Sequence, residues 1–179
     1  MKRNLLGLKM LLCALVLVMT IGIVNVLKAD EEMLLKEALD AIKGEYGAFY
    51  IPSKTIDPIA LENVYGVDLG LVESFEGECA YMSTHVDVFL GIKVKRGQAN
   101  RVENQLLAYR EALLIKFEGD AAKHAKIEAS KVHIYGDLVF FMVLGQNSDT
   151  LSSNEQAFLE KAEDEIKRGE RILEKVIRK

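Results

Sequence analysis

The chain begins with a long uninterrupted apolar segment. Residues 10–27 contain no charged side chain, three basic residues precede them, and the acidic run Asp30-Glu31-Glu32 follows. A basic flank before an apolar core is typical of a secretion signal, and a run of about 18 residues lies between a cleaved signal and a membrane span. Cleavage after Ala29 and retention as an anchor therefore both fit. The basic flank predicts a cytoplasmic amino end, with everything from Asp30 onward outside.

Beyond this segment, apolar positions at helical spacing predict helices. Asp57 followed by Pro58 has the form of an N-cap and a first helical residue, and Asn100 with Glu103 has the spacing of a capping pair. The expected helices lie at residues 31–43, 58–65 and 99–117 and from Ser152 or Ser153 into the tail, with one or two further turns over residues 68–75.

Two segments have the patterns of strands. Apolar and polar positions alternate over residues 81–95, which predicts a strand with one buried face. Residues 128–134 and 138–144 predict a hairpin about Gly136 and Asp137, a pair that suits a tight turn. The second arm is apolar at every position, so we expect it to be the central strand.

These elements predict one α+β domain over residues 30–179, after a signal peptide or membrane anchor over residues 1–29. The domain should contain a small antiparallel sheet of three to four strands packed with several helices. The last helix has an apolar stripe that begins at Phe158 and a basic end from Lys167 onward. Such a helix either docks on the sheet or rests on an anionic membrane, and the length of the stripe favours docking.

Charge and cysteine content narrow the class of protein. All 27 acidic residues but only 19 of the 23 basic residues follow Ala29, which leaves a net charge near −8. An acidic surface argues against nucleic acid as a partner. Cys79 is the only cysteine after the signal, so an intramolecular disulfide is excluded there. The chain has no zinc-protease, nucleophile-elbow or phosphate-loop motif, and nothing in it calls for a cofactor.

The first group of candidate binding residues lies on the expected strand of residues 81–95. His85 and Asp87 are two residues apart on one face, with Ser83 beside them. Such a trio could share a metal ion or polarise a hydroxyl group. A solvated strand face, or a turn at Asp87, explains the same residues without chemistry.

The second group is aromatic. Tyr46, Phe49 and Tyr50 lie in a connector close to Pro52, where they could line a groove for a peptide, glycan or lipid. Aromatic residues in a connector also commonly pin it to the core. Both interpretations stay open at the level of sequence.

Several short segments resemble a known family. They are Tyr50-Ile51-Pro52-Ser53, Tyr65-Gly66-Val67-Asp68, Met82-Ser83 with Asp87, Tyr109-Arg110, residues 125–132 and residues 136–145. Together they resemble the domain of unknown function 4358 family, exported proteins and lipoproteins of Firmicutes, over residues 33–159. The resemblance implies an envelope location and an α+β fold, and it supplies no activity or catalytic residues.

The sequence thus favours a non-enzymatic extracytoplasmic domain, secreted or tethered to the membrane by its N-terminal segment. Its expected partner is a cell-envelope protein or a wall component. The alternative is a metal-binding protein or a hydrolase centred on His85 and Asp87.

Overall fold

The computed structural model describes residues 32–82, 84–146 and 155–178 of a chain that divides into two compact units, Met1–Met33 and Leu34–Lys179. The predicted signal or anchor segment, Ser83 and the predicted caps Ser152 and Ser153 lie outside these residues. Among the residues described, no helix has both the length and the apolar character that a membrane span requires.

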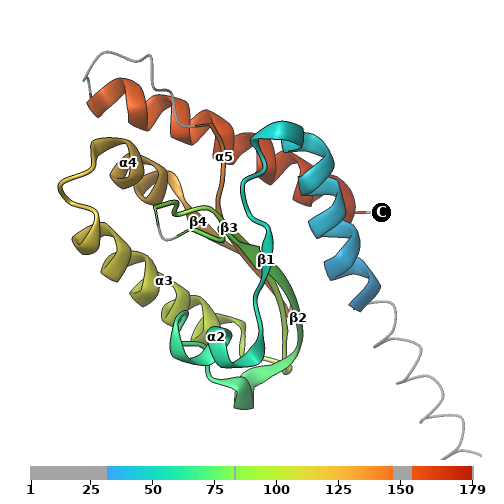
Figure 1. Cartoon of the computed structure of the whole chain (residues 1–179). Coiled ribbons are helices and arrows are strands. Elements are labelled where there is room, and N and C mark those ends of the chain that lie inside the picture. Colours follow the sequence, from blue (N-terminus) through green and yellow to red (C-terminus); the bar gives the residue numbers. More distant parts are fainter. Residues whose placement is uncertain (1–31, 83, 147–154, 179) are drawn as a thin grey trace, which may run out of the picture. The chain divides into compact units, whose positions relative to one another are not determined.

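An antiparallel sheet of five strands forms the centre of the second unit (Figure 1), which confirms the α+β prediction with one strand more than the upper limit expected. In spatial order the strands are β1 (Lys54–Thr55), β2 (Val72–Cys79), β3 (Val88–Val94), β5 (Leu138–Val143) and β4 (Lys131–Tyr135). Every residue of β3 and β5 is buried. The prediction that residues 138–144 form the central strand was wrong, because β2 and β1 extend the sheet beyond β3 and place β3 in the middle.

The predicted hairpin joins β4 and β5. Tyr135 pairs with Leu138, so Gly136 and Asp137 form the turn between them. Gly136 has φ +64°, in the left-handed region that glycine adopts at no steric cost. The first arm is shorter than expected, because the residues before Lys131 form helix α4 (Ala121–Ala129), which Asp120 caps by accepting from the Lys123 backbone N–H.

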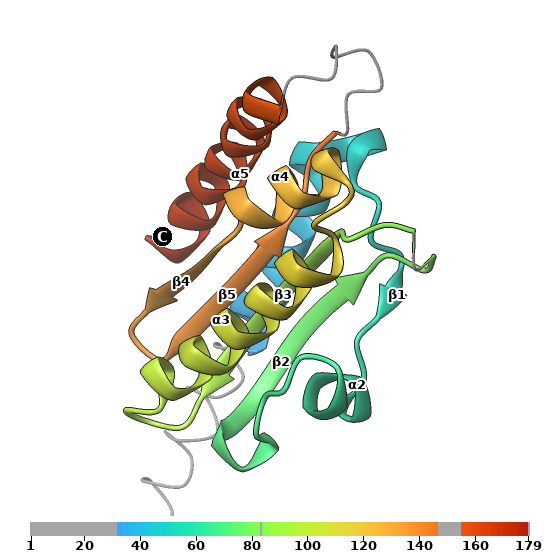
Figure 2. The ribbon, with the colours of Figure 1, turned by 90° about the vertical axis from the view of Figure 1, so that its left-hand side faces the viewer.

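Helices cover both faces of the sheet (Figures 1 and 2). One face carries α2 (Pro58–Asn63) and α3 (Ala99–Lys116). The other carries α5 (Glu155–Ile177) and the helix of residues 32–46, which belongs to this unit from Leu34 onward. The α2 prediction is confirmed, since Asp57 accepts a hydrogen bond from the Ala60 N–H at 2.7 Å.

Three other predictions were wrong. Residues 69–71 form a single 3-10 turn, η2 (Leu69–Leu71), which Asp68 caps at its start by accepting from the Gly70 N–H at 2.8 Å. The helix expected as far as Phe75 is replaced from Val72 onward by β2, which pairs with β3. The strand predicted over residues 81–95 begins only at Val88, since residues 80–82 and 84–87 are not part of a strand. We refer to this part of the chain as the loop of residues 80–87. Helix α3 has Gln98 as its N-cap, with no side-chain cap, so Asn100 and Glu103 are not a capping pair.

Helix α5 docks on the sheet, as its stripe predicted. Ala162, Ile166, Leu173 and Val176 are buried in the core of that face. Gly169 interrupts the stripe for a steric reason, because a Cβ there would lie 2.9 Å from Tyr46 Oη. That approach lets the Tyr46 hydroxyl donate to the Glu165 carbonyl at 2.6 Å, so glycine makes room for a bond between α5 and the helix of residues 32–46.

A half-buried histidine on β4 gives the fold a pH dependence. His133 Nε2 lies 3.5 Å from Glu170 Oε1 of α5, and Lys131 and Glu174 are its other charged neighbours. Burial lowers the pKa of His133, and the attraction of Glu170 only partly opposes it. The folded state therefore binds fewer protons than the unfolded state, so stability should fall as the pH drops below the unfolded value of about 6.5.

We expect His133→Gln to flatten this dependence below about pH 6.5, where the unfolded chain binds the proton more readily than the folded one. The measurement is the midpoint of urea unfolding at a series of pH values. His124→Gln on α4, where the imidazole is more exposed, is the matched control and should leave the slope as it is. An unchanged slope in His133→Gln would assign the dependence to other groups.

Candidate functional site

A buried ion pair joins α4 to the sheet. Lys126 Nζ of α4 lies 2.6 Å from Asp87 Oδ1, immediately before β3, and the two residues are 4% and 2% exposed. The same ammonium donates to the Gly145 carbonyl at 2.8 Å, just after β5. Removing two charges from water costs several kcal/mol for each ion, and pairing with added hydrogen bonds offsets that cost. Lys126 therefore fixes three segments of the chain around one point.

Arg110 of α3 holds α4 in place for this contact. Its guanidinium donates to the backbone carbonyls of Ile127, Glu128 and Ser130 at distances between 2.7 and 3.1 Å. These carbonyls belong to the C-terminal end of α4 and the residue after it, where the last carbonyls of a helix commonly accept from side chains. Arg110, part of the segment Tyr109-Arg110 that carried the family resemblance, thus has a positioning role.

A pocket of about 250 Å³ opens over the ion pair. Its walls come from four parts of the chain: η1 (Gly47–Phe49) with the connector after it, the loop of residues 80–87, α4, and the residues that follow β5. The lining residues are Phe49, Ile51, His85, Asp87, Lys126, Gly145 and Gln146. Three of the residues predicted for binding, Phe49, His85 and Asp87, therefore share one pocket although they belong to two predicted groups.

His85 lies at the side of this pocket with a third of its side chain exposed. Its Nδ1 is 3.9 Å from Asp87 Oδ2, which is beyond hydrogen-bond distance. Across the described ranges, no group of three His, Cys, Asp or Glu side chains is arranged to hold a metal ion. Ser83, the third member of the predicted trio, lies outside those ranges.

Tyr46 and Tyr50 do not line the pocket and instead pin the connector to the core. Tyr46 is 2% exposed, and burial raises the pKa of its hydroxyl. Burial and the nearby carboxylate of Glu78 likewise raise the pKa of Tyr50. Lys43 completes this cluster, since its Nζ bonds Glu78 at 2.7 Å and lies 5.7 Å from the centre of the Tyr50 ring. These contacts favour the interpretation in which Tyr46 and Tyr50 pin the connector to the core, and the groove stays a prediction for Phe49.

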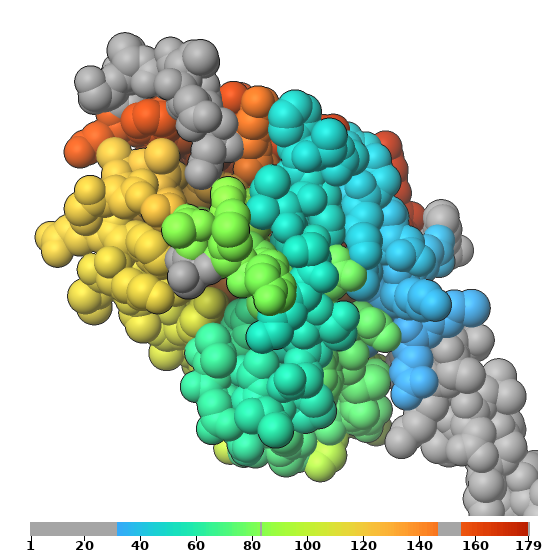
Figure 3. All heavy atoms as spheres, in the orientation of Figure 1, coloured from blue at the N-terminus to red at the C-terminus, as the bar shows by residue number. Residues whose placement is uncertain are grey.

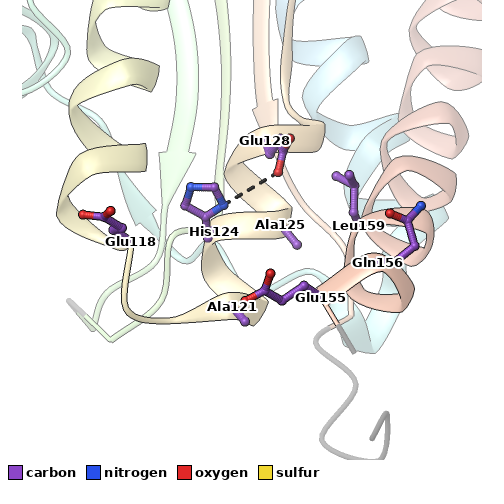
Figure 4. A pocket seen from close by; sticks show the side chains of 8 residues that line it. All are labelled: Glu118, Ala121, His124, Ala125, Glu128, Glu155, Gln156 and Leu159. Carbon is purple, nitrogen blue, oxygen red and sulfur yellow. Dashed lines mark ion pairs between the residues drawn. The ribbon is translucent and has the colours of Figure 1, made fainter. Parts of the chain in front are cut away.

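Two further pockets lie nearby. One of about 200 Å³ is on the other side of the loop of residues 80–87, lined by apolar side chains that include Val64, Met82 and Phe117, and His85 and Asp87 also border it. The other, about 360 Å³, lies between α4 and α5 (Figure 4). There His124 faces Glu128 across 3.7 Å, and the carboxylates that line the pocket among the described residues are exposed to solvent.

Comparison with known proteins gives one match. A family model described as Domain of unknown function (DUF4358) matches residues 45–144. The matched range contains all five strands and every pocket residue except Gly145 and Gln146. No curated protein and no solved structure matches the chain.

Proposed function

The chain belongs to the domain of unknown function 4358 family, and from that premise we propose that it is a non-enzymatic extracytoplasmic domain that binds a partner in the cell envelope. The binding face is the one around the loop of residues 80–87. We call it the loop-80 surface and define it by Phe49, Ile51, Tyr81 and Met82.

The loop-80 surface is a concentration of exposed large apolar side chains. Tyr81 is 81% exposed and Met82 58%, while Phe49 and Ile51 are 46% and 38% exposed. The Ser53 N–H donates to the Cys79 carbonyl at 3.0 Å, which holds the connector beside the start of the loop. In Figure 3 the loop, in light green, lies between the cyan connector and the yellow end of α3 and start of α4.

Exposed apolar groups of this kind support a protein interface. Aromatic residues and methionine are enriched at interfaces, and contiguous apolar patches on a soluble domain commonly mark contact sites. Asp87 supports a binding role, since its carboxylate is fixed by Lys126 at 2.6 Å and lines a pocket, where a fixed acceptor can orient a ligand. The single observation that carries the proposal is the exposed pair Tyr81 and Met82, a few residues before His85 and Asp87, which border two pockets.

A photo-crosslinking side chain placed at Tyr81 in intact cells tests both the partner and the location. We expect one discrete crosslinked product, because the side chain lies on the proposed interface. A tag after Lys179 should be removed from this product by protease added outside the cells, since the basic flank of residues 10–27 is N-terminal.

The matched control is the same substitution at Ile59, a residue of α2 that is 72% exposed and lies outside the three pockets. Equal crosslinking at both positions would contradict the proposed interface, and a tag protected from protease would contradict the extracytoplasmic location. Stoichiometric metal in the purified chain, lost in His85→Ala, would favour the metal-binding alternative instead.

A further inference from the structure

We infer that the pocket over the Asp87–Lys126 pair binds a single peptide group of an extended apolar segment of the partner, with the segment's side chains against Phe49 and Ile51. This inference rests on the proposed function and specifies the chemistry of the partner. It comes from the hydrogen-bonding capacity that the buried pair leaves unused.

Lys126 has a donor to spare. An ammonium group carries three N–H donors, and two of them are taken by Asp87 Oδ1 at 2.6 Å and the Gly145 carbonyl at 2.8 Å. Among the described residues the third donor has no acceptor. Because Lys126 is 4% exposed and lines the pocket, that donor can be satisfied only from the pocket itself.

Asp87 has an acceptor to spare in the same place. Its Oδ1 accepts from Lys126, whereas Oδ2 has only His85 Nδ1 as a charged neighbour, at 3.9 Å, among the residues described. Asp87 lines the pocket, so this oxygen is open to a donor that enters there. A ligand that offers one donor and one acceptor would pair with Asp87 Oδ2 and with the third N–H of Lys126 at once.

A peptide group meets this requirement. It presents one N–H and one C=O and carries no net charge, and the Asp87–Lys126 pair is itself neutral overall, which gives no excess charge to attract a phosphate or an amine. The rest of the pocket wall includes the apolar side chains of Phe49 and Ile51. A volume of about 250 Å³ is below the ~300–1,000 Å³ of small-molecule sites, so it suits a residue or two of an extended chain.

The test compares two probes on the full chain in lipid nanodiscs, with empty nanodiscs as the blank. The first probe is acetyl-leucyl-leucine amide, and the second is its ester analogue, in which oxygen replaces the central N–H. Titration followed by ligand-observed NMR should show the amide binding at least about tenfold more tightly, because the ester has lost the central N–H that is expected to donate to Asp87 Oδ2.

Variants then place the binding in this pocket. Phe49→Ala should weaken amide binding about tenfold or more while the circular dichroism spectrum stays the same, because Phe49 is 46% exposed and outside the core. Ile59→Ala, which removes an apolar side chain that is 72% exposed on α2, should leave binding unchanged. Neither variant touches the ion pair, so neither depends on its contribution to folding.

Three results would overturn the inference: equal binding of the amide and the ester, no binding of the amide at millimolar concentration, or displacement of the amide by inorganic phosphate or a chitin tetrasaccharide. If the amide fails to bind while crosslinking at Tyr81 persists, the inference is wrong and the proposed function stands. If the amide binds and Phe49→Ala weakens that binding, but Tyr81 yields no crosslink, the pocket binds a peptide group and the proposed interface is wrong.

Discussion

Replacing Lys126 by methionine is expected to lower the free energy of unfolding by about 3–5 kcal/mol. Methionine resembles the aliphatic part of the lysine side chain, so the expected loss of stability comes from removing the ammonium group. The substitution leaves the carboxylate of Asp87, 2% exposed, without the ammonium 2.6 Å away that offsets its burial. It also leaves the Gly145 carbonyl without its donor.

Urea unfolding of the chain from Asp30 onward measures this effect, and a double-mutant cycle with Asp87→Asn separates the pair from its surroundings. Each single variant leaves one buried charge without its partner, whereas the double variant removes both charges. The double variant should therefore lose less stability than the sum of the losses in the two single variants. Lys123→Met on the same helix is the control. Its partner Asp120 is 39% exposed, so the cost should stay below about 1 kcal/mol. A loss of under about 1 kcal/mol in Lys126→Met would show that the pair is solvated.

The elements that could be predicted from sequence are those in which a local signal and the tertiary environment agree. The hairpin of β4 and β5 follows from Gly136 and Asp137 between apolar runs, and α2 from Asp57 and Pro58. Strand β2 could not be found this way. Its sequence Val72–Cys79 places Glu73, Glu76 and Glu78 among few apolar residues, and it is a strand because β3 supplies backbone partners along its whole length.

Part of the candidate site could be predicted and part could not. Phe49, His85 and Asp87 were predicted from residue type alone, as aromatic and ionisable groups at the edges of apolar segments. Lys126 was missed because a lysine beside Lys123 and His124 has the composition of a solvated helix face. One signal pointed to it: Asp87 is a lone acid next to an apolar strand, and a buried acid requires a cation from elsewhere in the chain.

Truncating either of two adjacent phenylalanines on β5 should test the layered architecture. Phe140 and Phe141 are both fully buried, and alternation along the strand sends them to opposite faces of the sheet. Phe140 packs in the cluster under α5, with ring centres of Phe89 and Tyr135 at 6.2 and 6.1 Å. Phe141 lies in the cluster under α3, edge-on to Tyr109 at 6.0 Å.

Each single change to alanine should lower the free energy of unfolding by about 3–5 kcal/mol, as for other buried aromatic residues. Ile115→Ala, at a position 76% exposed, is the control and should stay within about 0.5 kcal/mol. The two losses should add, because the two side chains belong to different clusters and share no aromatic partner. The sum of the two losses approaches the ~5–15 kcal/mol by which a typical domain is stable. The double variant should therefore be largely unfolded without urea, whereas each single variant should still unfold cooperatively in urea. If both single variants lost less than about 1 kcal/mol, β5 would be a peripheral strand and the strand order given above would be wrong.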